Sequence, residues 1–110
     1  MAIDYPRAIA AYKVGAKGGD AACQYQLGMM HYEGKGVALD YKQAPPWIEK
    51  AAAQDLPNAV SMLGVMYAGG VGGPSSWRRP RELYKRAIEL GNSGAVKNMQ
   101  TLTKLIQKVS

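Results

Sequence analysis

The sequence predicts an all-α fold in which antiparallel helix pairs stack side by side as a solenoid of about six helices. Three observations support this prediction: the chain repeats itself every 36 residues, apolar residues in each unit recur at helical spacing, and glycines stand where helices should end. A single helix pair cannot bury its apolar face alone, so neighbouring pairs must stack to complete the core.

The repeat is visible without gaps when the sequence is shifted against itself by 36 residues. Identical residues then coincide at several positions: Leu27-Gly28 with Leu63-Gly64, Gly34 with Gly70, and Gly36 with Gly72. Agreement of several residue types at one offset distinguishes a repeat from chance similarity. We therefore expect one domain that consists of a half-repeat (1–19), two full repeats (20–55 and 56–91) and a C-terminal capping helix (92–110).

Each full repeat should hold two helices, called A and B in chain order. Asp20 can cap the first A helix, whose apolar stripe includes Leu27, and Gly34 suits the left-handed residue that ends it. Gly28 and Gly64 stand in the middle of the two A helices, where glycine costs about 0.5–1 kcal/mol relative to alanine. We expect a neighbouring helix to approach closely at both glycines.

The B helices should begin late or with a distorted first turn, because prolines stand near their starts. Pro45-Pro46 occupy this place in the first full repeat, and Pro80 replaces the equivalent of Ala44 in the second. Taken in order, the six helices are expected near residues 4–17, 20–33, 45–54, 57–68, 79–90 and 93–108.

The repeat motifs are specific enough to suggest a family. The residues that matter most are Leu27-Gly28, Gly34-Lys35-Gly36-Val37, Asp40, Lys50-Ala51-Ala52, and Leu63-Gly64-Val65-Met66-Tyr67 with Gly70 and Gly72. They resemble Sel1-like repeats, which are related to tetratricopeptide repeats, and the resemblance covers nearly the whole chain. It departs at His31, where the family usually has an aromatic residue, and at Leu83, where it usually has Trp. The resemblance implies a right-handed solenoid that serves as an adaptor or scaffold for protein complexes, with no catalytic residues.

The A-helix faces that do not pack on neighbours should form a continuous concave surface, which we expect to bind a peptide or protein segment. The expected binding residues are Tyr25, Met29, Tyr32, Ser61, Val65, Lys97, Thr101 and Lys104. This wall is aromatic and Met-rich at one end and cationic at the other, and the lysines favour an acidic partner. Partial packing within the solenoid is the alternative interpretation of Tyr25 and Tyr32.

Positive charge is concentrated in the second half of the chain. The net charge is +6, and residues 56–110 hold eight Lys or Arg against two Asp or Glu. The densest run consists of Arg78, Arg79, Arg81, Lys85 and Arg86. Such a run is usually a solvated helix face, but it gives an alternative function, binding of an anionic surface such as nucleic acid. We expect nucleic acid to be the less favoured partner, because no nucleic-acid-binding motif accompanies the run.

Candidates for catalysis and metal binding are few. His31 is the single imidazole and lies on the apolar stripe, where a packed and hydrogen-bonded role is expected. Cys23 lies about two helical turns, or ~12 Å, from it, which is too far for direct activation. One cysteine and one histidine cannot supply a zinc site. We therefore expect no enzyme activity, no metal ion and no cofactor.

The sequence also carries expectations about location and self-association. No apolar run reaches the ~18–20 residues of a membrane span, and Asp4 and Pro6 stand where a secretory signal would be apolar, so we expect a cytoplasmic protein. The first helix is of type B and has no A helix before it in this sequence. A homodimer could therefore form over its apolar residues, which are Ile3, Ala8, Ile9 and Tyr12.

Overall fold

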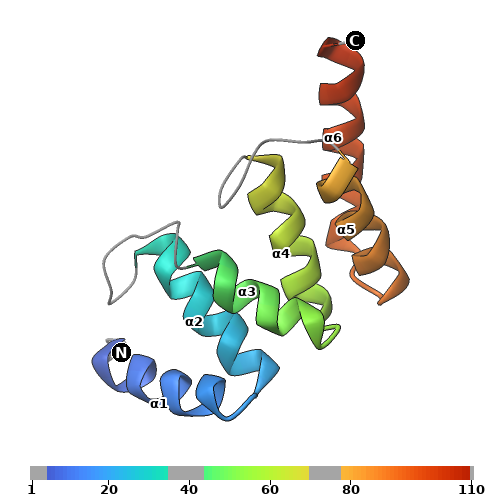
Figure 1. Cartoon of the computed structure of the whole chain (residues 1–110). Helices are drawn as coiled ribbons and strands as arrows, with labels where there is room; N and C mark the ends of the chain where they lie inside the picture. The colour runs from blue at the N-terminus through green and yellow to red at the C-terminus, as the bar shows by residue number, and fades with distance from the viewer. Residues whose placement is uncertain (1–4, 35–43, 70–77, 110) are drawn as a thin grey trace.

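A computed structural model describes residues 5–34, 44–69 and 78–109, which form six helices and no strand (Figure 1). The helices are α1 (Tyr5–Lys17), α2 (Ala21–Glu33), α3 (Ala44–Ala53), α4 (Pro57–Ala68), α5 (Arg78–Glu89) and α6 (Gly94–Val109). Every boundary lies within one residue of its predicted position. The predicted turn glycines Gly36, Gly70 and Gly72 lie outside the described residues.

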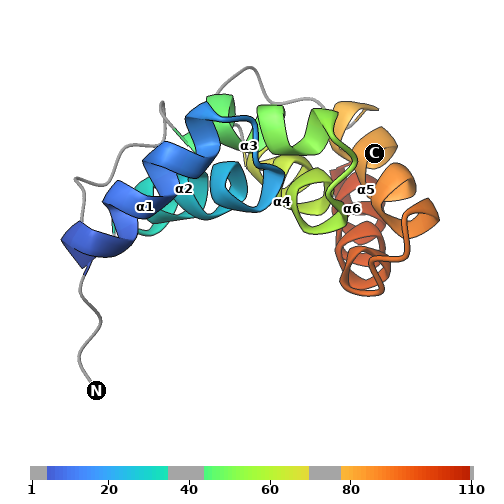
Figure 2. The same ribbon diagram turned by 90° about the horizontal axis from the view of Figure 1, so that it is seen from below.

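The helices form an elongated array that measures 46 × 28 × 26 Å. Each helix packs on the next one in the chain, and α4 also contacts α6. Seen from below in Figure 2, the array is an arch, with the B helices α1, α3 and α5 on its outer side and the A helices α2, α4 and α6 on its inner side. The predicted all-α solenoid is confirmed.

The core is divided into clusters that follow one another along the array. The central cluster joins α3 to α4 and consists of Ile48, Ala51, Ala59, Leu63 and Met66. A second cluster joins α1 to α2 through Ile9, Ala16 and Leu27, and a third joins α4, α5 and α6 through Val60, Ala87 and Ala95. Each cluster is formed by two or three helices that lie next to one another in the array. The stability of the array is therefore a sum of local interfaces.

The three corners that lead from a B helix into the next A helix share one backbone geometry. Residues 19, 55 and 91 occupy the left-handed region, with φ of 94° at Gly19, 60° at Asp55 and 94° at Gly91. These residues are 36 apart, so the shift found in the sequence also relates the corners in space. At Asp55 this conformation costs roughly 1 kcal/mol, because the residue has a Cβ atom.

Helix caps recur in the same register. The Asp20 carboxylate accepts a hydrogen bond from the Cys23 backbone N–H at 2.8 Å, which confirms the predicted cap and holds the pKa of Asp20 below its ordinary value. At the third corner the Asn92 side-chain oxygen accepts one from the Ala95 N–H at 2.9 Å. Leu56, at the middle corner, cannot cap, and proline follows it at the start of α4.

The glycine predictions for Gly34 and Gly64 are confirmed, and the close approach expected at Gly28 stays a prediction. Gly34 ends α2 with φ of 70°. A Cβ atom on Gly64 would stand 2.7 Å from the Tyr84 ring, so α5 approaches α4 at the distance that only glycine permits. Tyr84 is only 3% exposed, which makes this contact part of the interface between α4 and α5.

The expectation that the leading helix leaves its apolar residues uncovered is wrong for Ile9, which is 7% exposed. Leu27 of α2 belongs to the same cluster as Ile9, and Trp47 of α3 packs against it, so α2 and α3 supply the cover. Ile3 lies outside the described residues. Nothing in the fold tests a homodimer, which stays a prediction.

One contact at the first corner differs from its equivalents. A Cβ atom on Gly15 would stand 2.3 Å from the Cys23 sulfur. The 36-residue shift pairs Gly15 and Cys23 with Ala51 and Ala59, and both alanines are fully buried. The larger sulfur at the first corner is thus matched by a smaller partner, and the two volumes compensate each other.

This compensation makes a prediction for paired substitutions. Gly15→Ala should lower the free energy of unfolding by about 1–3 kcal/mol, because the added methyl group collides with the Cys23 side chain. Adding Cys23→Ala should restore stability to at least the original level, since alanine also removes the ~0.5–1 kcal/mol cost of a glycine within a helix. Urea denaturation of both single variants and the double variant measures the coupling. Simple additivity of the two effects would contradict the volume argument.

Candidate functional site

The predicted binding residues of α2 lie partly within the core. Tyr25, Met29 and Tyr32 are half-buried and pack against the central cluster. Burial, and then the charge of Glu33, raises the pKa of Tyr25 above its ordinary value. These side chains therefore support the solenoid and present only part of their surface on the inner side of the arch.

Ser61, from α4, serves as a link between helices. It is 7% exposed, and its hydroxyl accepts a hydrogen bond from the Asn98 side-chain amide at 3.2 Å. A second bond of this type runs from the Asn92 amide to the Asn58 side-chain oxygen at 2.8 Å. Together they tie the starts of α4 and α6. Ser61 was predicted from the sequence, but Asn98 was missed because the 36-residue shift aligns Ser61 with Lys97 instead.

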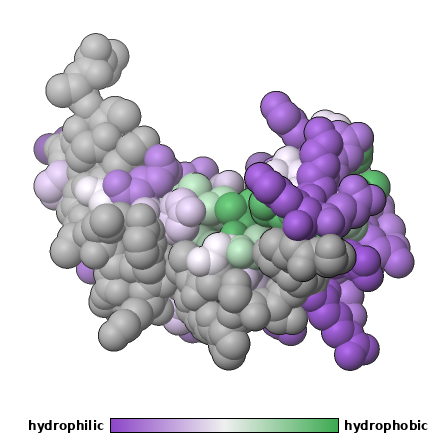
Figure 3. Space-filling view, turned by 90° about the horizontal axis from the view of Figure 1, so that it is seen from above, coloured by the Kyte–Doolittle hydropathy of each residue, from purple (hydrophilic) through white to green (hydrophobic). Residues whose placement is uncertain are grey.

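A groove of about 190 Å³ lies between α4 and α6 on the inner side of the arch. Its lining residues are Val65, Ala68, Tyr84, Asn98, Thr101, Leu102 and Leu105. Two of the predicted residues, Val65 and Thr101, thus line one site. Figure 3 shows a hollow on this side of the molecule with hydrophobic residues in its middle and hydrophilic residues around it. Tyr84 and Leu102 were missed because both are buried and show only an edge to the groove.

The predicted lysines do not line this groove, but they flank its lining residue Thr101 along α6. Lys97 precedes Thr101 by four residues and Lys104 follows it by three, so all three lie on one helix face, about one turn apart. Both lysines are exposed, and α6 contains no Asp or Glu. The Thr101 hydroxyl donates to the Lys97 carbonyl oxygen at 3.1 Å. Two exposed cations thus lie one turn before and one turn after a residue that lines the groove.

The basic run on α5 is largely engaged within the protein. Arg86 pairs with Asp55 at 2.8 Å, and this hydrogen bond raises the pKa of the guanidinium. Arg78 lies 3.5 Å from Glu82, and the Arg79 guanidinium stacks over the Tyr67 ring at 4.9 Å. Among the predicted patch residues, this leaves two exposed cations with neither an ion pair nor a ring contact in the described part of the chain, Arg81 and Lys85.

Among the described residues, neither candidate catalytic side chain, Cys23 or His31, has the surroundings of an activated nucleophile or base. The Nδ1 atom of His31 is buried and has no hydrogen-bond partner among the described residues, so the expected hydrogen bond is not formed there. Burial, with the nearby Asp20 carboxylate, raises the pKa of the Cys23 thiol, which disfavours the reactive thiolate. Within residues 5–34, 44–69 and 78–109, no three His, Cys, Asp or Glu side chains gather to hold a metal ion. None of the helices in these ranges has the length and apolar character needed to cross a membrane.

The chain is similar to solved structures of repeat proteins. A Sel1 repeat protein from Oxalobacter formigenes matches with a TM-score of 0.86 and 31% identity, over 93% of this chain and 42% of that one. A protective antigen from uropathogenic Escherichia coli strains, which displays an SLR fold, matches with a TM-score of 0.80 and 30% identity, over 86% of this chain and 20% of that one. This chain thus spans less than half of the length of either protein.

The cysteine rich protein B of Helicobacter pylori shares the fold, with a TM-score of 0.80 and 19% identity over 86% of this chain and 71% of that one. No protein-family model matches the sequence. No curated protein matches it either.

Three buried or half-buried tyrosines link ionisation to stability. Burial is the main cause that raises the pKa of Tyr25, Tyr67 and Tyr84 above the ordinary value of 10.0. Tyrosines in the unfolded chain therefore ionise at lower pH than these three do in the folded protein. Their contribution to stability is complete below pH 10 and is lost as the pH rises through the folded-state pKa values.

We predict that the free energy of unfolding falls above pH 10 and that Tyr84→Phe makes the fall less steep. The substitution removes a hydroxyl group whose ionisation is opposed in the folded state. Urea denaturation of both proteins between pH 8 and pH 11.5 measures how steeply the free energy of unfolding falls with pH in each. Lysine ionisation affects both proteins equally, so it does not change the difference between them. Identical slopes would show that Tyr84 ionises as easily in the folded protein as in the unfolded chain.

Proposed function

This chain is a Sel1-like repeat protein, and from that premise we propose that it is a non-catalytic interaction module whose concave face binds a segment of another protein. The observation that carries the proposal is the groove between α4 and α6, which is lined mainly by apolar side chains and whose lining residue Thr101 is flanked along α6 by two exposed lysines. A surface of this kind suits a segment with an apolar residue and flanking carboxylates.

The two parts of the groove contribute differently to binding. Full burial of one large apolar side chain supplies about 1.5–3 kcal/mol, which makes the apolar floor the source of affinity. The exposed lysines supply about 0–1 kcal/mol each and act mainly on the rate of association and the orientation of the partner. Lys97 and Lys104 therefore select an acidic segment, while Val65, Leu102 and Leu105 hold its apolar residue.

The aromatic end of the concave face extends this surface over α2. Tyr25, Met29 and Tyr32 keep part of their area exposed beside the central cluster, so they can flank a bound segment. Their substitution by alanine would also remove core contacts, which makes them poor test positions. Leu105 is better suited, since it is 45% exposed and lines the groove directly.

We predict that Leu105→Glu, and separately Lys97→Glu combined with Lys104→Glu, lowers the recovery of a bound partner at least about tenfold. The first change places a charge on the apolar floor, and the second reverses the charge on the two lysines that flank Thr101. The matched control is Val96→Glu, because Val96 is 43% exposed on the same helix but does not line the groove. Affinity purification with quantitative mass spectrometry of all four proteins gives the comparison.

A partner retained by both groove variants, or lost equally in the Val96 control, would contradict the concave site. Thermal melting of each variant separates lost binding from lost folding. The substituted residues are all exposed, so melting temperatures close to the original are expected.

The alternative, binding of nucleic acid through Arg78, Arg79, Arg81, Lys85 and Arg86, has less support. Ion pairs and ring stacking engage three of these cations within the protein. The two remaining ones, Arg81 and Lys85, neutralise few phosphates, and weak binding with a shallow salt dependence would follow. This alternative stays a prediction.

A further inference from the structure

A second cleft, of about 350 Å³, lies between the B helices α3 and α5. Its lining residues are Glu49, Ala52 and Ala53 from α3, Leu63 from α4, and Arg79 and Leu83 from α5. None of them lines the groove between α4 and α6. The cleft is therefore a separate site, between two helices of the outer layer in Figure 2.

The floor of this cleft is apolar and its two charged residues have opposite signs. Leu63 is 3% exposed, and Leu83 packs partly buried against the same central cluster. Glu49 belongs to α3 and Arg79 to α5, so each helix contributes one charge. A ligand that fits must combine an apolar group with both a negative group and a hydrogen-bond donor.

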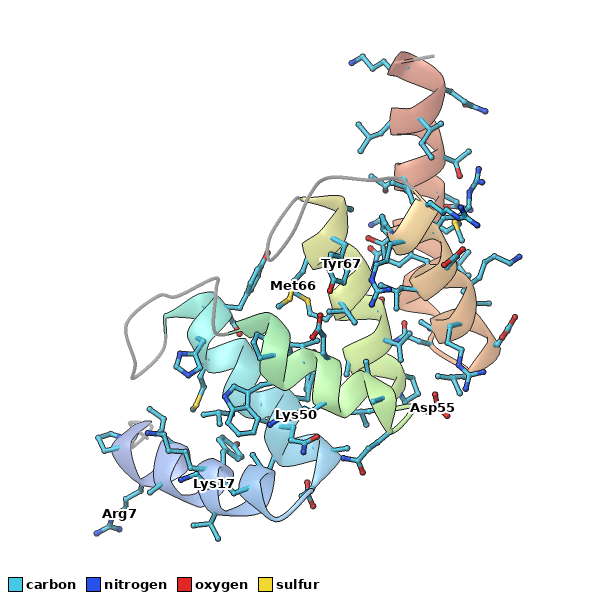
Figure 4. All side chains as sticks on the ribbon, viewed as in Figure 1. Arg7, Lys17, Lys50, Asp55, Met66 and Tyr67 are labelled. Carbon is cyan, nitrogen blue, oxygen red and sulfur yellow. The ribbon has the colours of Figure 1, made fainter. Side chains whose placement is uncertain are left out.

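Tyr67, labelled on α4 in Figure 4, connects the two charges. Its hydroxyl donates a hydrogen bond to the Glu49 carboxylate, and the Arg79 guanidinium stacks over its ring. Burial and the Glu49 charge both raise the pKa of Tyr67, which keeps the hydroxyl a neutral donor. Tyr67 thereby orders Glu49 and Arg79 before any ligand arrives.

The repeat register shows that the fold does not require this trio. Residues that build the solenoid recur every 36 positions, as the corners and small residues do. The trio does not recur: the equivalents are His31 and Thr103 for Tyr67, Lys13 and Lys85 for Glu49, and Arg7 and Gln43 for Arg79. A set of residues that occurs once in a repeating array is better explained by a ligand than by packing.

We propose that this cleft binds the carboxyl terminus of a peptide that ends in an apolar residue. A guanidinium has five N–H donors, and the contact of Arg79 with Tyr67 leaves some of them to bind the terminal carboxylate. The last side chain packs on Leu63 and Leu83, and Glu49, whose carboxylate has further acceptor sites, accepts the backbone N–H of that residue. The opposite charges fix the direction of the peptide, since Glu49 repels its carboxylate.

The test uses fluorescein-labelled pentapeptides that end in leucine, either as the free acid or as the amide, and measures anisotropy with the 110-residue chain. The free acid should bind at least about tenfold more tightly than the amide. Replacing the terminal leucine by serine should weaken binding about fivefold or more, because the apolar floor loses its partner.

Substitutions then assign the contacts. Arg79→Gln should remove the difference between acid and amide, whereas Arg81→Gln, a change of an exposed arginine on the same helix outside the cleft, should preserve it. Tyr67→Phe keeps the ring under the guanidinium and removes the hydroxyl group that holds Glu49. It should weaken binding of both peptides by similar factors and leave their ratio unchanged.

Equal binding of acid and amide, an unchanged ratio in Arg79→Gln, or no binding of the leucine acid at about 1 mM would overturn the proposal. Leu105→Glu, which disables the concave groove, should leave the peptide affinity unchanged. The failure of one site is therefore distinguishable from the failure of the other.

Discussion

Close approach of neighbouring helices at small residues is the constraint on which this solenoid depends. At Gly64 the ring of Tyr84 occupies the space where any other residue would carry its Cβ atom, and at Ala51, Ala59, Ala87 and Ala95 buried methyl groups take the same role at the corners. Tight spacing lets short helices bury small cores, and it brings α4 and α6 near enough to share the Ser61–Asn98 hydrogen bond. The groove above that bond exists because the two helices are held at this separation.

The sequence was sufficient for the architecture because its signals are local. Helix ends follow from proline, capping residues and left-handed glycine, and each of these acts within a few residues. The Asp20 cap and the Gly34 terminus were predicted for this reason, and the 36-residue shift extended the same reasoning along the chain.

The site was less predictable because it depends on volumes and partners from several helices. Helical spacing assigns Ser61 to the concave face but does not reveal that Asn98 already occupies its hydroxyl. In the same way, spacing places Tyr25 and Tyr32 on the inner side without showing how much of each ring the central cluster covers. The α5 arginines are engaged by Glu82 on the same helix and by Asp55 and Tyr67, which lie outside it and whose contacts helical spacing does not reveal.

The shared geometry of the three corners bears on how such a chain can evolve. Because residues 19, 55 and 91 have the same backbone handedness, each corner presents the following helix in an equivalent direction. A duplication or deletion that begins at one corner and ends at another would join surfaces that already match, so whole units could be gained or lost by recombination without a new interface having to arise. Residues that occur in only one repeat, such as Tyr67, would then have arisen after duplication. At these positions one repeat acquired a role that the other repeats lack.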